Sequence, residues 1–184
     1  MRLGAKVTLP TFAVSIALLI VGASAVYLQG AVVVVNERAA LLSAETIEAS
    51  DVRALSRAVQ RDALKLSVPA WSEEKDKLAG KVETRSQELL ARAAKLAALV
   101  DRADAEMSTH FVALQRDVVD AVGRAKAAGL AGRYAEATEI LKSQVQPAER
   151  AASKLTDGFI ERSERDAAAL AAEARRIDRG ARAA

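Results

Sequence analysis

The sequence predicts an all-α protein in which an N-terminal transmembrane helix precedes an antiparallel, up-down-up-down four-helix bundle. Three observations support this fold class. An uncharged apolar run lies near the start of the chain, and apolar residues recur at steps of three and four along the remainder. The composition combines 51% apolar and 28% charged residues with only 3% aromatic residues, which is typical of long helices rather than sheets.

The uncharged run extends from Val7 to Val35. A membrane-spanning helix needs about 20 apolar residues, and this run reaches that length. Arg2 and Lys6 precede it, so the positive-inside bias places the N-terminus in the cytoplasm. We therefore expect residues 1–35 to form a cytoplasmic N-terminus and a single-pass anchor in a bacterial inner membrane. Residues 36–184 are expected to form one periplasmic domain.

A cleavable secretory signal is a second interpretation of the same run. Ala23-Ser24-Ala25 is a small-x-small site that follows basic residues and an apolar segment. The apolar character continues from Val26 to Val35, however, and cleavage would leave this valine-rich end without a lipid partner. Both interpretations remain open, and the length of the run favours the uncleaved anchor.

The first two helices of the predicted bundle are separated by Pro69. The first helix continues from the anchor and ends before Pro69, because a proline pushes the preceding residue out of the helical region. The second begins near Ser72, a suitable N-cap followed by two glutamates, and gives way to the third near Asp101 to Asp104. The expected buried stripes are Val52, Leu55, Val59, Ala63 and Leu66 on the first helix and Leu78, Val82, Leu89, Ala93, Leu96 and Val100 on the second.

The third and fourth helices are separated by Gly129-Leu130-Ala131-Gly132, since glycines supply the left-handed conformation that a helix end requires. The fourth helix is expected from Tyr134 to Gly180, with a kink at Pro147 because proline removes an intrahelical hydrogen bond. The expected stripes are Met107, Phe111, Leu114, Val118, Ala121, Ala125 and Ala128 on the third helix and Tyr134, Ala137, Leu141, Val145, Ala148, Ala152, Leu155, Phe159, Leu170, Ala174 and Ile177 on the fourth.

Two stretches resemble a known family. The run from Gly132 to Ala137, with Ile140-Leu141 and Pro147-Ala148, is similar to the third-to-fourth-helix region of the four-helix-bundle sensor domains of bacterial methyl-accepting chemotaxis receptors. Residues 51–55 resemble the first helix of those domains. The resemblance implies a ligand-binding sensory domain in signal transduction or chemotaxis, and a parallel homodimer in which the first helices face each other.

The chain departs from that family at its C-terminus. In the family, the fourth helix continues into a second transmembrane helix, a HAMP module and a signalling hairpin, whereas residues 175–184 contain no second apolar span. Three readings remain open: a truncated receptor, an accessory sensor that acts through a membrane signalling partner, and a fragment that ends before its second span.

Sequence motifs for catalysis are missing. The chain has no phosphate-binding glycine loop, no HExxH, no GxSxG and no cysteine, so we expect no enzyme activity, cofactor or metal site. Acidic and basic residues are interleaved and the net charge is only +3, which argues against nucleic-acid binding. We expect His110 to be a partly exposed bundle residue, and Trp71 to cover one end of the bundle.

The candidate ligand-binding residues are Arg53, Arg57 and Arg61 of the first predicted helix. Their i, i+4, i+8 spacing places them along one helix face that is not the apolar stripe. Guanidinium groups can bind a carboxylate bidentately, and the resemblance implies such a use at a dimer interface. The plainer interpretation is a solvated ridge, with Asp51 and Asp62 available as neutralising partners.

Two other functions are compatible with these residues. One is an anchored helical scaffold or coiled coil without a ligand. The other is a secreted periplasmic bundle that binds envelope proteins or peptides after signal cleavage.

Overall fold

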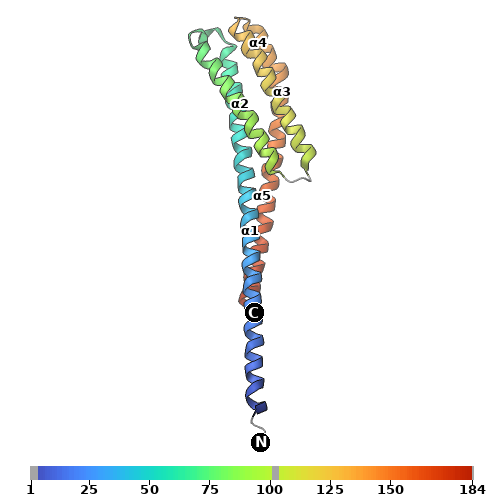
Figure 1. The fold of residues 1–184 in the computed structure, drawn as a ribbon. Coiled ribbons are helices and arrows are strands. Elements are labelled where there is room, and N and C mark those ends of the chain that lie inside the picture. The colour runs from blue at the N-terminus through green and yellow to red at the C-terminus, as the bar shows by residue number, and fades with distance from the viewer. Residues whose placement is uncertain (1–3, 101–103, 184) are drawn as a thin grey trace. The chain divides into compact units, whose positions relative to one another are not determined.

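The computed structural model describes the backbone of residues 4–100 and 104–183, and the side chains of residues 29–70, 74–100 and 104–180. All regular elements in these residues are helical, so the prediction of an all-α fold is confirmed (Figure 1). In chain order they are α1 (Gly4–Leu66), the 3₁₀ segment η1 (Pro69–Glu74), α2 (Lys75–Leu99), α3 (Ala105–Leu130), α4 (Tyr134–Ile140), the π-helical segment η3 (Leu141–Val145) and α5 (Gln146–Ala183).

The chain forms two compact units. One contains residues 41–165, and the other contains residues 1–40 together with 166–184. Within the 41–165 unit, α3 packs against α2, α4 and η3. The domain boundary expected between residues 35 and 36 depends on the anchor and stays a prediction.

The core of the 41–165 unit is one apolar cluster to which α1, α2, α3, η3 and α5 all contribute. Its two largest members, Phe111 and Phe159, are fully buried and meet edge to face with ring centroids 5.4 Å apart. This is a favourable geometry for aromatic rings. Most positions of the predicted stripes are confirmed as core members: Val52, Val59, Ala63, Leu66, Leu78, Val82, Leu89, Ala93, Leu96, Val118, Ala121, Ala125, Leu141, Val145 and Ala152. The remaining members include Leu55, Met107, Leu114, Ala148 and Leu155, which are only partly buried against the core.

Two glycines near the C-terminus of α3 have different structural roles. Gly132 has φ 74°, its N–H donates to the carbonyl of Gly129, and the N–H of Arg133 donates to the carbonyl of Ala128. This pair of bonds is the Schellman arrangement that ends many helices. Gly129 has a separate role, because a Cβ placed on it would lie 2.5 Å from the carbonyl oxygen of Leu66. The glycine therefore permits the close approach of α3 to the end of α1.

The helix boundaries confirm the predicted breaks and correct two of them. The boundary expected near Asp101 to Asp104 agrees with the helix ends, since α2 ends at Leu99 and α3 begins at Ala105, while residues 101–103 themselves lie outside the described residues. The start predicted near Ser72 is wrong, because the chain from Pro69 forms a 3₁₀ segment and α2 begins at Lys75. The end predicted at Gly180 is also wrong. Glycine in a helical conformation costs only about 1 kcal/mol, and α5 continues to Ala183.

The interruption predicted at Pro147 takes the form of a π turn immediately before it. The N–H of Gln146 donates to the carbonyl of Leu141, five residues back, which widens the helix over η3. Pro147 itself has no N–H to donate. The π turn thus lies where a regular α-helical hydrogen-bond ladder would be broken in any case, and such turns are frequent at functional sites.

Among the residues that the structure describes, no helix combines the length and the apolar character that crossing a membrane requires. The predicted anchor falls largely on residues 1–28, whose side chains lie outside the described residues. The anchor therefore stays a prediction.

Candidate ligand-binding groove

The structure separates the three arginines that the sequence groups on one ridge. Arg53 is 27% exposed and forms an ion pair with Asp157 of α5, so its charge already has a partner. Arg57 and Arg61 are exposed, and neither forms an ion pair with a described residue. Only these two remain available for a ligand.

Arg57 and Arg61 line a groove of about 280 Å³ between α1 and η3. We call it the α1–η3 groove. Its lining consists of residues from about two turns of α1 and from the π segment with the first residue of α5: Arg57, Gln60, Arg61, Leu64, Leu141, Val145 and Gln146. The arginines therefore face a structured surface of the same chain, and not only solvent.

Gln60 adds a third polar group to this groove. Its Nε2 is buried and has no hydrogen-bond partner in the structure. A buried donor that is left unpaired costs about 1–3 kcal/mol. Because this nitrogen has almost no accessible surface, it does not present a donor to the open groove. The exposed donors that line the groove are therefore the guanidinium groups of Arg57 and Arg61.

The rest of the groove is mostly apolar. Leu141 and Val145, the first and last residues of η3, are 5% and 1% exposed, and Leu64 of α1 is 54% exposed. None of the residues that line the groove carries a carboxylate. The groove can therefore hold an anionic group beside an apolar surface.

The aspartates that the sequence offers as partners for the arginine ridge pair elsewhere. Asp62 forms an ion pair with Arg85, and Asp51 with Arg92, both on α2. These pairings leave Arg57 and Arg61 without a neutralising carboxylate on their own helix. Asp51 and Asp62 therefore do not neutralise these two arginines, and a solvated ridge stays the alternative to a ligand site.

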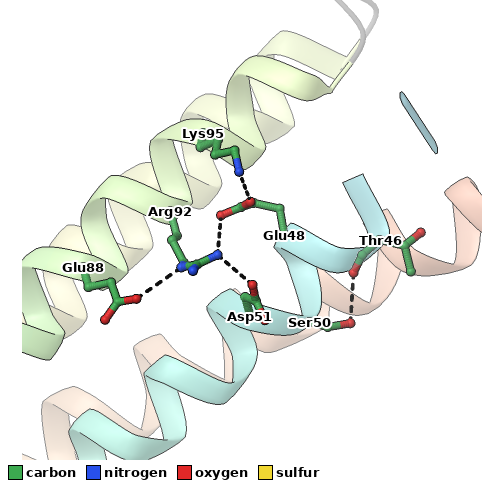
Figure 2. A network of polar contacts seen from close by, with 7 residues as sticks. All are labelled: Thr46, Glu48, Ser50, Asp51, Glu88, Arg92 and Lys95. Carbon is green, nitrogen blue, oxygen red and sulfur yellow. Dashed lines mark hydrogen bonds and ion pairs between the residues drawn. The ribbon is translucent and has the colours of Figure 1, made fainter. Parts of the chain in front are cut away.

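Asp51 belongs to a polar network between α1 and α2 that centres on Glu48 (Figure 2). Glu48 is 2% exposed, and its carboxylate accepts hydrogen bonds from Lys95 Nζ at 2.6 Å and from Arg92 Nη1 at 3.1 Å. Arg92 Nη1 also lies 2.6 Å from Asp51 Oδ2. The hydrogen bond from Lys95 lowers the pKa of Glu48, against the opposing effect of burial.

A second buried carboxylate, Glu45, connects α1 to α5. Arg162 donates to Glu45 Oε1 at 3.2 Å and also forms an ion pair with Asp104, just before α3. Glu45 and Glu48 continue the spacing of the buried stripe toward the start of the unit, and that spacing is the signal that could have identified them. Both carboxylates are paired with basic side chains of neighbouring helices, so we assign both residues to packing between helices.

The remaining sequence candidates contribute less. His110 is exposed on α3 and lines a separate shallow cavity with Asp104, Glu106 and Met107. The side chain of Trp71 lies outside the described residues. In the part of the chain that the structure describes, no group of histidine, aspartate and glutamate side chains is arranged to hold a metal ion.

Sequence reasoning identified Arg57 and Arg61 but missed the other groove residues. Leu141 and Val145 were recognised as core residues, and Gln60 carried no signal of its own, because its role depends on which helix lies opposite. Comparison of the chain with protein-family models, with curated proteins and with solved structures finds no match.

Proposed function

We propose that the chain is a membrane-anchored periplasmic sensory domain, of the kind used in signal transduction or chemotaxis, that binds a small anionic ligand in the α1–η3 groove. One observation carries the proposal. Two exposed arginines of α1 that form no ion pair with a described residue line a groove whose other side is formed by a π turn. The resemblance to chemoreceptor sensor domains, stated from the sequence, agrees with this role.

We propose that the π turn passes a ligand-induced change in the groove on to α5. A ligand that contacts α1 and η3 together would favour one arrangement of these two elements over others. Packed helices change between discrete arrangements and do not deform continuously. A small movement of η3 would be passed directly to α5, which begins at the next residue.

An antiparallel four-helix bundle is the finer form of the fold that we propose for the 41–165 unit. The pairs Glu45–Arg162 and Arg53–Asp157 show that position numbers rise along α1 as they fall along α5. The pairs formed by Glu48 and Asp62 with α2 run in the same sense. These ion pairs are consistent with up-down-up-down connectivity.

A parallel homodimer through α1 is part of the proposal. Within the 41–165 unit, the exposed side chains of α1 include a stripe with alternating steps of four and three, as in a coiled-coil seam. Its members are Ser43, Ile47, Ser50, Ala54, Arg57, Arg61 and Leu64. Cysteines at these positions should crosslink in membranes, and cysteines at the buried positions Val52 and Val59 should not. Uniform or absent crosslinking would favour a monomer.

The ligand proposal is tested by isothermal titration calorimetry on the full chain in lipid nanodiscs, against amino acids, dicarboxylates and monocarboxylates. Replacing Arg57 or Arg61 with alanine should weaken binding by about 1.5–3 kcal/mol, the range for hydrogen bonds to charged groups. Arg116→Ala, an exposed arginine on α3, is the matched control. If no anion binds, or if the double variant binds as tightly as the unaltered chain, the proposed ligand site is wrong.

Two measurements separate this function from its rivals. A reporter that is active only in the periplasm, fused after residue 184, should be active if the topology is as proposed. Mass spectrometry of the mature N-terminus distinguishes an anchor from a cleaved signal, and hence from a secreted bundle that binds envelope proteins. An anchored scaffold without a ligand would pass both of these tests and fail the calorimetry.

A further inference from the structure

We infer that the α1–η3 groove selects a monocarboxylate with a short apolar body, in preference to an α-amino acid or a dicarboxylate. The inference rests on the proposed function of this groove and names the chemical class of its ligand. Three features of the lining support it: the two arginines of α1, the aliphatic side chains of Leu64, Leu141 and Val145, and the missing carboxylates.

The donors suit a single carboxylate. Arg57 and Arg61 each present a planar group with five N–H donors and no acceptor. Gln60 contributes a buried Nε2 that has no partner. A carboxylate has two oxygens with about four acceptor positions, and it can accept from a guanidinium in bidentate geometry. One carboxylate in the groove can therefore be held by the guanidinium groups of Arg57 and Arg61, whereas the Gln60 nitrogen lies covered next to them.

The apolar part of the lining suits a hydrocarbon body. Leu64, Leu141 and Val145 carry branched aliphatic side chains and no polar atoms. A second carboxylate at the far end of the ligand would lose water against these side chains and would find no cationic partner there, only the neutral amide of Gln146. Removal of a charge from water without a partner is strongly unfavourable, so a dicarboxylate is disfavoured.

The missing carboxylates argue against an α-amino acid. An ammonium group needs an anionic partner when it leaves water, and none of the groove residues is acidic. Arg57 and Arg61 would repel it. Gln146 offers only a neutral amide oxygen as acceptor.

The size of the groove limits the body of the ligand. The groove is open to solvent and has a volume of about 280 Å³. Since a water molecule occupies about 30 Å³ in the liquid, this volume corresponds to roughly nine waters. A ligand of about eight or nine non-hydrogen atoms fits, which is the size of hexanoate or benzoate.

The test uses three six-carbon probes that differ in one group each: hexanoate, adipate, which adds a second carboxylate at the far end, and norleucine, which adds an α-ammonium group. Each is titrated into the full chain in nanodiscs, with empty nanodiscs as the reference for partitioning into lipid. Hexanoate should bind at least tenfold more tightly than either of the others. Benzoate should compete with it.

Variants then place the binding in the groove. Gln60→Glu keeps the size of the side chain but adds a negative charge, and should weaken hexanoate binding at least tenfold. Leu64→Ser removes exposed aliphatic surface and should weaken it several-fold. Ile47→Ser is the matched control, because Ile47 is 58% exposed on the same helix but does not line the groove. Circular dichroism verifies that each variant is folded.

The outcomes distinguish this inference from the proposed function. If adipate or norleucine binds as tightly as hexanoate, and Arg57→Ala abolishes that binding, the groove is an anion site but the ligand class is wrong. If hexanoate binds equally to the Leu64→Ser and Ile47→Ser variants, the apolar wall has no role and the inference is overturned. If none of the anions in the wider panel binds, the proposed ligand site fails together with the inference.

Discussion

Replacing Gly129 with alanine should destabilise the protein, although alanine is the better helix former. Gly129 lies in the last turn of α3, where this helix approaches the end of α1. The Cβ of an alanine would lie 2.5 Å from the carbonyl oxygen of Leu66 and 3.0 Å from its carbonyl carbon. Both are backbone atoms, which cannot rotate away as the end of a flexible side chain can.

The size of the effect follows from the overlap. Ordinary van der Waals contacts of a Cβ begin at 3.4 Å, so α1 and α3 would have to separate locally by about 3.4 − 2.5 = 0.9 Å. Overpacking of this kind costs about 1–3 kcal/mol, and a backbone neighbour favours the upper part of that range. The change from glycine to alanine offsets at most about 1 kcal/mol in a helix interior. We expect a net loss of about 1–2 kcal/mol.

Gly123 of the same helix provides the matched control. A Cβ on Gly123 meets no atom within 4 Å, so Gly123→Ala should stabilise the protein by up to about 1 kcal/mol. Urea unfolding of the full chain in mild detergent, followed by circular dichroism, measures both variants. Stabilisation of both variants to the same degree would refute the close approach of α3 to Leu66.

Three further predictions concern the 41–165 unit. Phe159→Ala should lower the free energy of unfolding by about 3–5 kcal/mol in a urea titration, because this fully buried ring leaves a cavity behind. Asp157→Ala should change the same free energy by less than about 1 kcal/mol, because its ion pair with Arg53 is partly solvated, and a larger loss would show that this pair is essential. Glu48→Gln should reduce the loss of unfolding free energy at acidic pH. Since Lys95 lowers the pKa of Glu48 in the folded protein below its ordinary 4.5, the carboxylate stabilises the fold above pH 4.5, and this contribution disappears as the pH falls through the pKa of the folded state. An unchanged dependence of stability on acidic pH would contradict this.

The buried carboxylates of α1 help to set the register in which this helix packs against its neighbours. Glu45 and Glu48 lie within the packed interface, where an unpaired charge would be strongly destabilising. Each is paired with basic residues of a different helix, Glu48 with α2 and Glu45 with α5. They therefore favour one register of α1 against both neighbours, in the way that buried polar groups can fix the register of a coiled coil.

The sequence determined the helical class, the buried stripes and most of the breaks. These features depend on local rules. Apolar spacing selects the helix face, and proline disfavours a helical conformation in the residue before it. Glycine at position 132 readily adopts the positive φ that ends α3. The errors at Ser72 and Gly180 have the same origin. A local signal permits a helix to start or end there, but whether it does so depends on neighbouring packing.

The tertiary structure decided which charges meet. Asp62 pairs with Arg85, 23 residues away, and Arg53 with Asp157, 104 residues away. Spacing along one helix contains no information about such partners, so an arginine ridge that is uniform in sequence becomes one paired and two unpaired residues. The α1–η3 groove has the same cause. Its arginines and Leu64 come from α1, whereas Leu141 and Val145 come from a π turn, and only the packing of these two elements brings them together.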